Sequence, residues 1–177
     1  VTKSREAMNW LHKSAKDIVK ARGEDQEGVI SWVTPSGFIA SQAYYEVNSH
    51  QVDCKLFGDM RIDIRVMSEG NEPSSTRHAS GLAPNFVHSM DASHMHLVAA
   101  AASSLGIDAL HMVHDDFGTH AADTQNLFRM IRMQFVDMYK QHDPIGAFHE
   151  KYPETAYPPP KGDLDIEEVL WSDFFFS

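Results

Sequence analysis

The sequence has a single cysteine, few basic residues and no long apolar run. Because Cys54 is the only thiol, an internal disulfide and a zinc site built on several cysteines are excluded, and a reducing compartment is expected. No apolar stretch approaches the roughly 20 residues that span a bilayer. The first residues, VTKSREAMNW, also lack the apolar core of a secretory signal. These absences favour a cytoplasmic protein, a monomer with no membrane partner.

Basic residues are outnumbered, with 15 Lys and Arg against 25 Asp and Glu, giving a formal net charge of -10. Composition alone therefore disfavours nucleic-acid binding, which draws on Lys and Arg. Mg²⁺ sites, however, need carboxylates where phosphates are to bind. The 177 residues suffice for one domain or slightly more. The chain begins without Met, in what reads as a helix already under way, so we expect a piece of a longer protein.

Hydrophobic spacing predicts an α+β chain. Pro84 is expected in the first turn of a helix, Asp123 is expected to cap another, and the polar residues 68–80 are expected to form a flexible loop that separates two regions. Helices are predicted over residues 4–22, 83–104, 123–139 and 144–150, a last helical turn over 163–171, and strands over 29–34, 38–47, 107–113 and 116–120.

Residues 50–67 are predicted to form a separate β-hairpin, with its turn at Gly58-Asp59. Strict alternation places apolar residues on one side of each strand and polar residues on the other. The polar side is formed by Gln51, Asp53 and Lys55 on the first strand and by Arg61, Asp63 and Arg65 on the second.

Residues 110–120, LHMVHDDFGTH, carry the most concentrated chemistry. Two short strands are predicted to meet at a tight turn that presents His114, Asp115 and Asp116. A carboxylate held at such a turn suits a Mg²⁺ ligand that must also admit a phosphate. An ordinary turn is the alternative, because Asp favours turns. A zinc shared by His111 and His114 is disfavoured, because residues three apart on a strand face opposite sides.

In the helix predicted over 83–104, His88, Asp91 and Met95 share one face, and Asn85 lies one turn before His88. This polar stripe either is satisfied by neighbouring elements or belongs to a helix that contacts a nucleic-acid minor groove.

Four segments of the chain resemble the bacteriophage and mitochondrial single-subunit DNA-directed RNA polymerases. They come in that family's order and rough spacing. The segments are SWVTPSGF at 31–38, SGLAPNFVHSMDASHM at 80–95, VHDDFGTHAAD at 113–123 and GDLDIEEVLWSDFFFS at 162–177.

The resemblance implies part of a right-hand polymerase fold. Residues 1–78 would be the C-terminal part of the fingers with a protruding promoter-specificity hairpin at about 50–67. Residues 79–177 would be the palm, in which a catalytic β-hairpin packs on helices, ending in a C-terminal foot. That foot would comprise Phe174, Phe175, Phe176 and Ser177.

The resemblance also implies roles for single residues. Asp115 would be the catalytic, metal-binding aspartate, His114 the catalytic-site histidine beside it, and His88 a residue near the base pair at the growing RNA end. The intact enzyme would use two Mg²⁺ ions, one activating the RNA 3′-hydroxyl and the other stabilising the pyrophosphate that leaves the NTP. Its partners would be double-stranded promoter DNA, RNA and NTPs.

The polar side of the 50–67 hairpin would then enter the DNA major groove, which admits a two-stranded ribbon. The alternative is a solvated surface held by cross-strand ion pairs. The chain departs from the resemblance at Ser31 and Ile39, where phage members often have His and Pro.

The resemblance places the first catalytic Asp, and a helix whose Lys and Tyr grip the nucleotide, in segments that these 177 residues do not contain. We therefore predict that this chain alone binds Mg²⁺ weakly and does not polymerise. Three other interpretations remain open: the palm of a family A DNA polymerase, a non-catalytic DNA-binding module, and a structural remnant. Asp116 argues against the DNA polymerase, which normally has Glu after the catalytic Asp.

Overall fold

The structure is a computed structural model that describes residues 2–22, 28–56 and 60–175; the side chains at 55, 56, 60 and 61 are outside this description. The described residues combine helices with antiparallel strand pairs, in agreement with the α+β prediction. The elements are α1 (Thr2–Arg22), β1 (Val29–Val33), β2 (Ile39–Ala43), β3 (Tyr45–Leu56), β4 (Met60–Pro73), α2 (Ser75–Ser104), β5 (Leu110–Val113), β6 (Asp116–Thr119), α3 (Thr124–Gln141) and α4 (Pro144–Lys151), with 3-10 turns η1 (Ala121–Asp123) and η2 (Ile166–Leu170).

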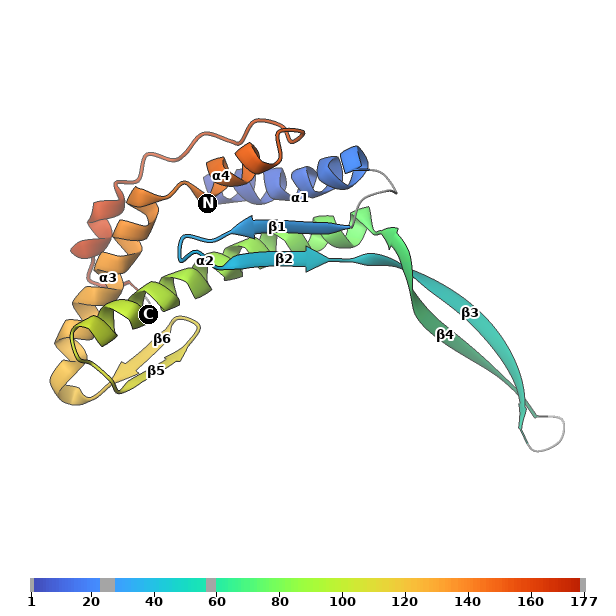
Figure 1. The fold of residues 1–177 in the computed structure, drawn as a ribbon, viewed down its shortest axis with the longest axis horizontal. Helices are drawn as coiled ribbons and strands as arrows, with labels where there is room; N and C mark the ends of the chain where they lie inside the picture. The colour runs from blue at the N-terminus through green and yellow to red at the C-terminus, as the bar shows by residue number, and fades with distance from the viewer. Residues whose placement is uncertain (1, 23–27, 57–59, 176–177) are drawn as a thin grey trace.

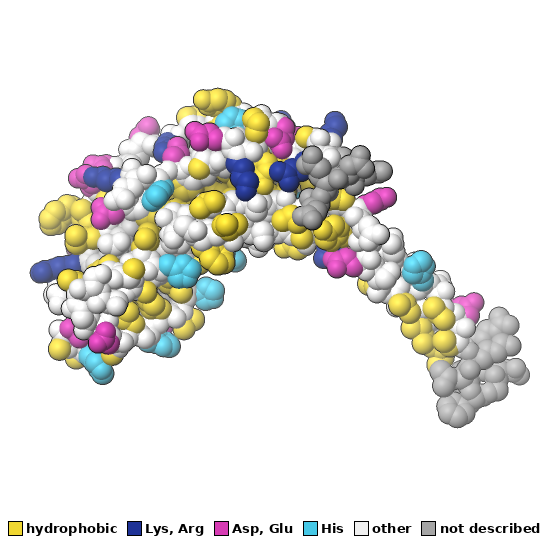
Figure 2. Space-filling view, viewed as in Figure 1, with side chains coloured by type: hydrophobic (Ala, Val, Ile, Leu, Met, Phe, Trp, Pro, Cys, Tyr) yellow, Lys and Arg dark blue, Asp and Glu magenta, His cyan; other side chains and the backbone are white. Residues whose placement is uncertain are grey.

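The strands of the described residues form three separate antiparallel pairs, β1–β2, β3–β4 and β5–β6. The β3–β4 pair projects from one end of the molecule, while β5–β6 lies near the opposite end, below α2 (Figure 1). The body and the projecting hairpin together form an arch with a concave side (Figure 2). None of the described helices combines the length and the apolar character needed to cross a membrane.

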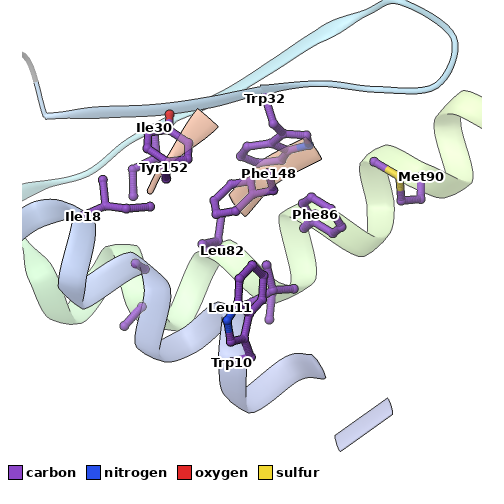
Figure 3. Packing of buried hydrophobic residues seen from close by; sticks show 13 residues of the cluster. Trp10, Leu11, Ile18, Ile30, Trp32, Leu82, Phe86, Met90, Phe148 and Tyr152 are labelled. Carbon is purple, nitrogen blue, oxygen red and sulfur yellow. The ribbon is translucent and has the colours of Figure 1, made fainter. Parts of the chain in front are cut away.

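The main core lies where α1, α2, α4 and β1 meet (Figure 3). Phe148 of α4 makes edge contacts with three other rings, those of Trp10, Trp32 and Phe86. Trp32 of β1 also donates a hydrogen bond from Nε1 to Ser89 Oγ of α2 at 2.8 Å. The segment 31–38 is thereby fixed against α2, which carries the second of the four segments, 80–95.

A smaller core holds the β5–β6 hairpin in place. Its buried members come from the C-terminal half of α2, the following loop and α3, with Phe117 of β6 packed against them. The hairpin is therefore a supported element rather than a free loop. The buried members are Val98, Ala102, Ile107, Leu127 and Met130.

The predicted loop over 68–80 is wrong. Strand β4 continues to Pro73, because residues 66–69 pair with residues 47–50 of β3. Helix α2 begins two residues later at Ser75, after Ser74, whose side chain accepts a hydrogen bond from Arg77 N. The helix thus runs through position 78, and Pro84 lies inside it rather than in its first turn. Pro84 is tolerated because it and Ser80 are exposed, so water can satisfy the freed carbonyl.

Two further predictions need correction. The strand predicted over 38–47 is two strands, since β2 pairs with β1 while β3 pairs with β4. Asp123 occupies the N-cap position of α3, but its side chain makes no capping hydrogen bond, because the preceding η1 turn already gives it a helical backbone. The turn at Gly58-Asp59 lies outside the described residues.

Candidate active site and nucleic-acid interface

The β5–β6 turn presents His114 and Asp115, as the sequence predicts. Val113 pairs with Asp116, which leaves only two residues at the turn. His114 has a φ of 55°, in the left-handed region that such two-residue turns require and that favours glycine. A histidine here accepts some backbone strain, which is a feature that clusters at functional sites. The turn thus fixes the exposed carboxylate of Asp115 on a short, rigid hairpin.

Asp115 lines a pocket of about 250 Å³ between the hairpin, α3 and the C-terminal segment. Asp116 and Asp173 add two further carboxylates, and Arg132 of α3 adds a cation. The C-terminal segment forms one wall through Phe174 and Phe175. Of the predicted foot, Phe176 and Ser177 lie outside the described residues.

Asp91 of α2 approaches the same turn from the helix side. Its Oδ2 lies 3.9 Å from Nδ1 of His114. Burial, and then the negative charge of Asp91, raise the pKa of the Tyr139 hydroxyl in α3 above its usual value. Asp91 of α2 therefore lies close to both the Asp115 turn and Tyr139 of α3. The sequence placed Asp91 on the face of His88 but gave no sign of this contact.

The carboxylates that line the pocket meet some of the requirements of a Mg²⁺ site. Carboxylate oxygens suit this ion, which is often held by one or two carboxylates together with substrate phosphates. Within residues 2–22, 28–56 and 60–175, however, no group of three or more His, Cys, Asp or Glu side chains is close enough to hold a metal ion. The described residues thus fit part of a magnesium site and do not complete one.

His94 is a buried residue behind the pocket that the sequence did not reveal as special. Nε2 of its ring donates to the carbonyl of Ile131 at 2.8 Å. The ring also contacts the rings of Phe117, Phe135 and Phe175 at centroid distances of 5.8, 5.5 and 6.5 Å. Burial is the main cause that lowers the pKa of His94. A neutral histidine thus joins the hairpin, α3 and the C-terminal segment.

His88 lies in a different hollow, between β2 and α2, and the structure does not bring it into the pocket of Asp115. Trp32, Phe38 and Asn85 also line this hollow. The orientation of Asn85 is fixed, because its Nδ2 donates to Gln42 Oε1 at 2.9 Å. Histidine side chains also gather on the concave side near β5–β6 (Figure 2).

The amide of Gln42 is oriented in turn by a buried histidine. Its Nε2 donates to the carbonyl of His78, which can only accept, at 3.2 Å. Burial lowers the pKa of His78, whose side chain has no exposed area. The backbone N–H of Tyr44, next to the start of β3, donates to His78 Nε2 at 3.2 Å, so the base of the projecting hairpin and the hollow of His88 share one hydrogen-bond network.

The β3–β4 hairpin places on one face those four of the six predicted reading residues whose side chains are described. Directly opposed residues in an antiparallel pair point to the same side. The described side chains, those of Gln51, Asp53, Asp63 and Arg65, are exposed. The side chains of Lys55 and Arg61 lie outside the description, although their strand pairing is defined. The opposed pairs are Gln51 with Arg65, Asp53 with Asp63, and Lys55 with Arg61.

Among the described side chains, two like charges, those of Asp53 and Asp63, therefore face each other. Such an arrangement is destabilising, and among the described side chains no ion pair bridges the two strands. Cross-strand ion pairing therefore does not account for the charges on this face. The other face is apolar and also exposed, through Val52, Ile62, Ile64 and Val66.

Comparison with known proteins places this geometry in a family. Residues 1–157 match the family described as DNA-dependent RNA polymerase. The chain is 34% identical to the DNA-directed RNA polymerase of Enterobacteria phage K11 and 33% identical to T7 RNA polymerase of Escherichia phage T7, with 97% of the chain covered in each case. It is 35% identical over 98% of its length to DNA-directed RNA polymerase 3, chloroplastic, of Nicotiana sylvestris.

The chain spans 21%, 22% and 17% of the length of these three relatives. The match nevertheless runs through both cores, the Asp115 turn and the projecting hairpin. On this evidence, the chain belongs to the DNA-dependent RNA polymerase family.

Proposed function

We propose that this chain forms the C-terminal part of a phage-type single-subunit RNA polymerase that acts by two-metal nucleotidyl transfer. Residues 1–78 correspond to the end of the fingers and residues 79–177 to the palm and foot, with α2 crossing this division. Family membership and the four ordered sequence segments support this assignment. The complete enzyme takes promoter DNA and NTPs as substrates, releases RNA and works as a monomer in the cytoplasm.

Asp115 is the residue that carries the proposal. Its carboxylate is exposed, fixed at a two-residue turn and open to a pocket that two other carboxylates line. Asp115 would hold Mg²⁺ together with a carboxylate from outside these 177 residues. The bound ions would lower the pKa of the RNA 3′-hydroxyl and neutralise charge on the leaving pyrophosphate. His114 lies beside Asp115 at the turn and faces Asp91.

The concave side is the proposed path of nucleic acid. His88 and the oriented Asn85 line a hollow on α2, where they would contact the minor groove of the growing RNA–DNA hybrid. The polar face of β3–β4 would read promoter bases in the major groove, in which Arg suits guanine, Asp can accept from cytosine and Gln suits adenine. The opposed Asp53 and Asp63 support this role, because cytosine amino groups at a bound DNA edge can donate to carboxylates that repel each other in the free hairpin.

The test is the substitution Asp115→Asn in the complete polymerase. Loss of one negative charge at the metal site should lower kcat by roughly a thousandfold or more, because metal-held charge stabilisation supplies several kcal/mol of the barrier reduction. RNA synthesis from a promoter template measures the rate. Asp108→Asn is the matched control, since Asp108 is exposed and lies outside the pocket.

An Asp115→Asn enzyme that keeps more than about a tenth of the native rate would contradict the proposed role. A comparison of rNTP with dNTP incorporation by the native enzyme separates the RNA polymerase from a DNA polymerase.

A further inference from the structure

Arg132 is a buried cation that forms no ion pair with a carboxylate among the residues that the structure describes. It is 5% exposed, and none of the ion pairs formed by those residues includes it. Its Nε is buried without a hydrogen-bond partner in the same part of the chain. Burying a charge in this way is costly, so the few contacts that Arg132 does make must compensate for lost water.

Those contacts lead to the C-terminal segment. Nη2 of Arg132 donates to the carbonyl of Ser172 at 2.8 Å. The guanidinium lies over the ring of Phe128, one turn earlier in α3, at 3.9 Å, and at 5.4 Å from the ring centroid of Phe175. Phe175 in turn packs against Phe135 at a centroid distance of 5.0 Å. One side chain of α3 thus binds both the backbone and an aromatic ring of the segment.

The same segment closes the pocket of Asp115. Arg132, Asp173, Phe174 and Phe175 line this pocket opposite the catalytic turn. Any displacement of the segment would open one wall and move the carboxylate of Asp173 away from Asp115. The contacts of Arg132 are therefore placed to control the shape and the charge of the site without reaching Asp115 directly.

We propose that Arg132 is a positioning residue that holds residues 172–175 against the catalytic pocket, and that it acts on nucleotidyl transfer through this segment. The inference rests on the proposed polymerase function. A charge-assisted hydrogen bond together with two ring contacts is needed, so an apolar side chain of similar length cannot replace the guanidinium. Lysine keeps the charge but not the planar fork, and should restore the function only in part.

The experiment is a double-mutant cycle in the complete polymerase, combining Arg132→Met with removal of residues 172–177, which takes away every contact of Arg132 with the segment. Each change alone should lower kcat by roughly 10- to 100-fold, the range expected for a charge-assisted hydrogen bond, while the KM for NTP stays within about twofold. The combined variant should be no slower than the truncated enzyme, because Arg132 then has no segment left to position. Arg132→Lys should fall between the native enzyme and Arg132→Met.

Arg129→Met, at an exposed position of α3, is the matched control and should leave kcat unchanged. If the decrease in kcat of the combined variant equals the product of the two single decreases, the inference is overturned, because Arg132 would then act independently of the segment. A native kcat for Arg132→Met would overturn it as well. If Arg132→Met does not fold, Phe175→Ala removes the ring contact from the side of the segment. The combination of Phe175→Ala with Arg132→Lys must then lower kcat by less than the product of the two single effects.

The Asp115→Asn enzyme separates the two claims. If it is inactive while Arg132→Met is neutral, only the positioning role fails. If Asp115→Asn is fully active, the proposed catalytic site itself fails.

Discussion

At the scale of single residues, two buried histidines lie beneath the two proposed functional surfaces. His94 is 2% exposed and lies between the β5–β6 hairpin, α3 and the C-terminal segment, and His78 is fully buried at the base of the projecting hairpin. Burial is the first cause that lowers the pKa of both rings. Both are neutral hydrogen-bonding groups, and protonation would place a charge in an interior that cannot solvate it.

These lowered pKa values predict a pH-dependent stability. In the unfolded chain the pKa of a histidine is about 6.5. Above this pH the two histidines are neutral in both the folded and the unfolded chain, so they should not make the free energy of unfolding depend on pH. Below it, the unfolded chain binds protons that the folded chain does not. The free energy of unfolding should then fall as pH decreases, by up to about 1.4 kcal/mol per pH unit for each histidine. Urea unfolding of the 177-residue chain between pH 7.5 and 5.5 measures the slope.

His94→Gln keeps an N–H donor for the carbonyl of Ile131. It should reduce the slope of unfolding free energy against pH by up to about 1.4 kcal/mol per pH unit, the contribution of one histidine. His142→Gln, at an exposed position just after α3, is the control. An unchanged slope in the His94→Gln chain would mean that His94 does not contribute to the pH dependence.

At the scale of elements, the two outer hairpins differ in how they are supported. The β5–β6 hairpin packs on a core formed by α2 and α3, so its turn is held rigidly, as a metal ligand requires. The longer β3–β4 hairpin projects away from the body (Figure 1) and exposes both of its faces. A projecting ribbon can enter a groove that the body cannot reach. The support of each hairpin therefore agrees with its proposed role.

Substitutions on the polar face of β3–β4 should affect promoter use and spare the chemistry. Gln51→Ala or Arg65→Ala in the complete polymerase should reduce promoter-dependent initiation by roughly 5- to 150-fold, the value of one lost base contact. Extension of a preassembled RNA–DNA hybrid should not change. His50→Ala is the control, because His50 is exposed on the opposite face of the same strand. Equal losses in both assays would argue against base recognition.

At the scale of the whole molecule, the concave side joins these surfaces. The projecting hairpin stands at one end of the arch and the β5–β6 hairpin at the other (Figure 1). Residues of β2 and α2 line the hollow of His88, and Asp115 of the β5–β6 turn lines the second pocket. Nucleic acid that followed the concave side would meet recognition, pairing and catalysis in turn. The net charge of -10 does not favour DNA binding by itself, so basic surfaces from outside these residues are expected to supply most phosphate contacts.

The 177-residue chain by itself should synthesise no RNA. The described residues complete no metal site, and the resemblance places the partner carboxylate and the nucleotide-binding helix in other segments. Incubation with Mg²⁺, NTPs and a promoter template, followed by detection of labelled RNA, tests this. The Asp115→Asn chain controls for contaminating polymerase. RNA made by the native chain but not by this control would refute the prediction.

The sequence by itself determined the local structure and the turn that carries Asp115. Helical spacing and strand alternation depend on neighbours in the chain, so α1, α3, α4 and the β5–β6 hairpin were predicted within a few residues. The common face of Gln51 and Arg65 also followed from alternation, and the strand register confirms it. The long polar extension of β4 was missed because a projecting hairpin buries nothing on either face, so no apolar pattern marks residues 68–73.

Only the tertiary structure decided which distant residues meet. Arg132 and Arg129 look alike in the sequence, yet one is buried against the C-terminal segment and the other is exposed. His94 and Asp91 acquire their contacts only when α2 packs on α3 and the hairpin. Packing between elements depends on the crossing of whole helices, which the spacing of residues along one helix does not encode. The Asp115 turn could therefore be found from sequence, whereas the pocket around it could not.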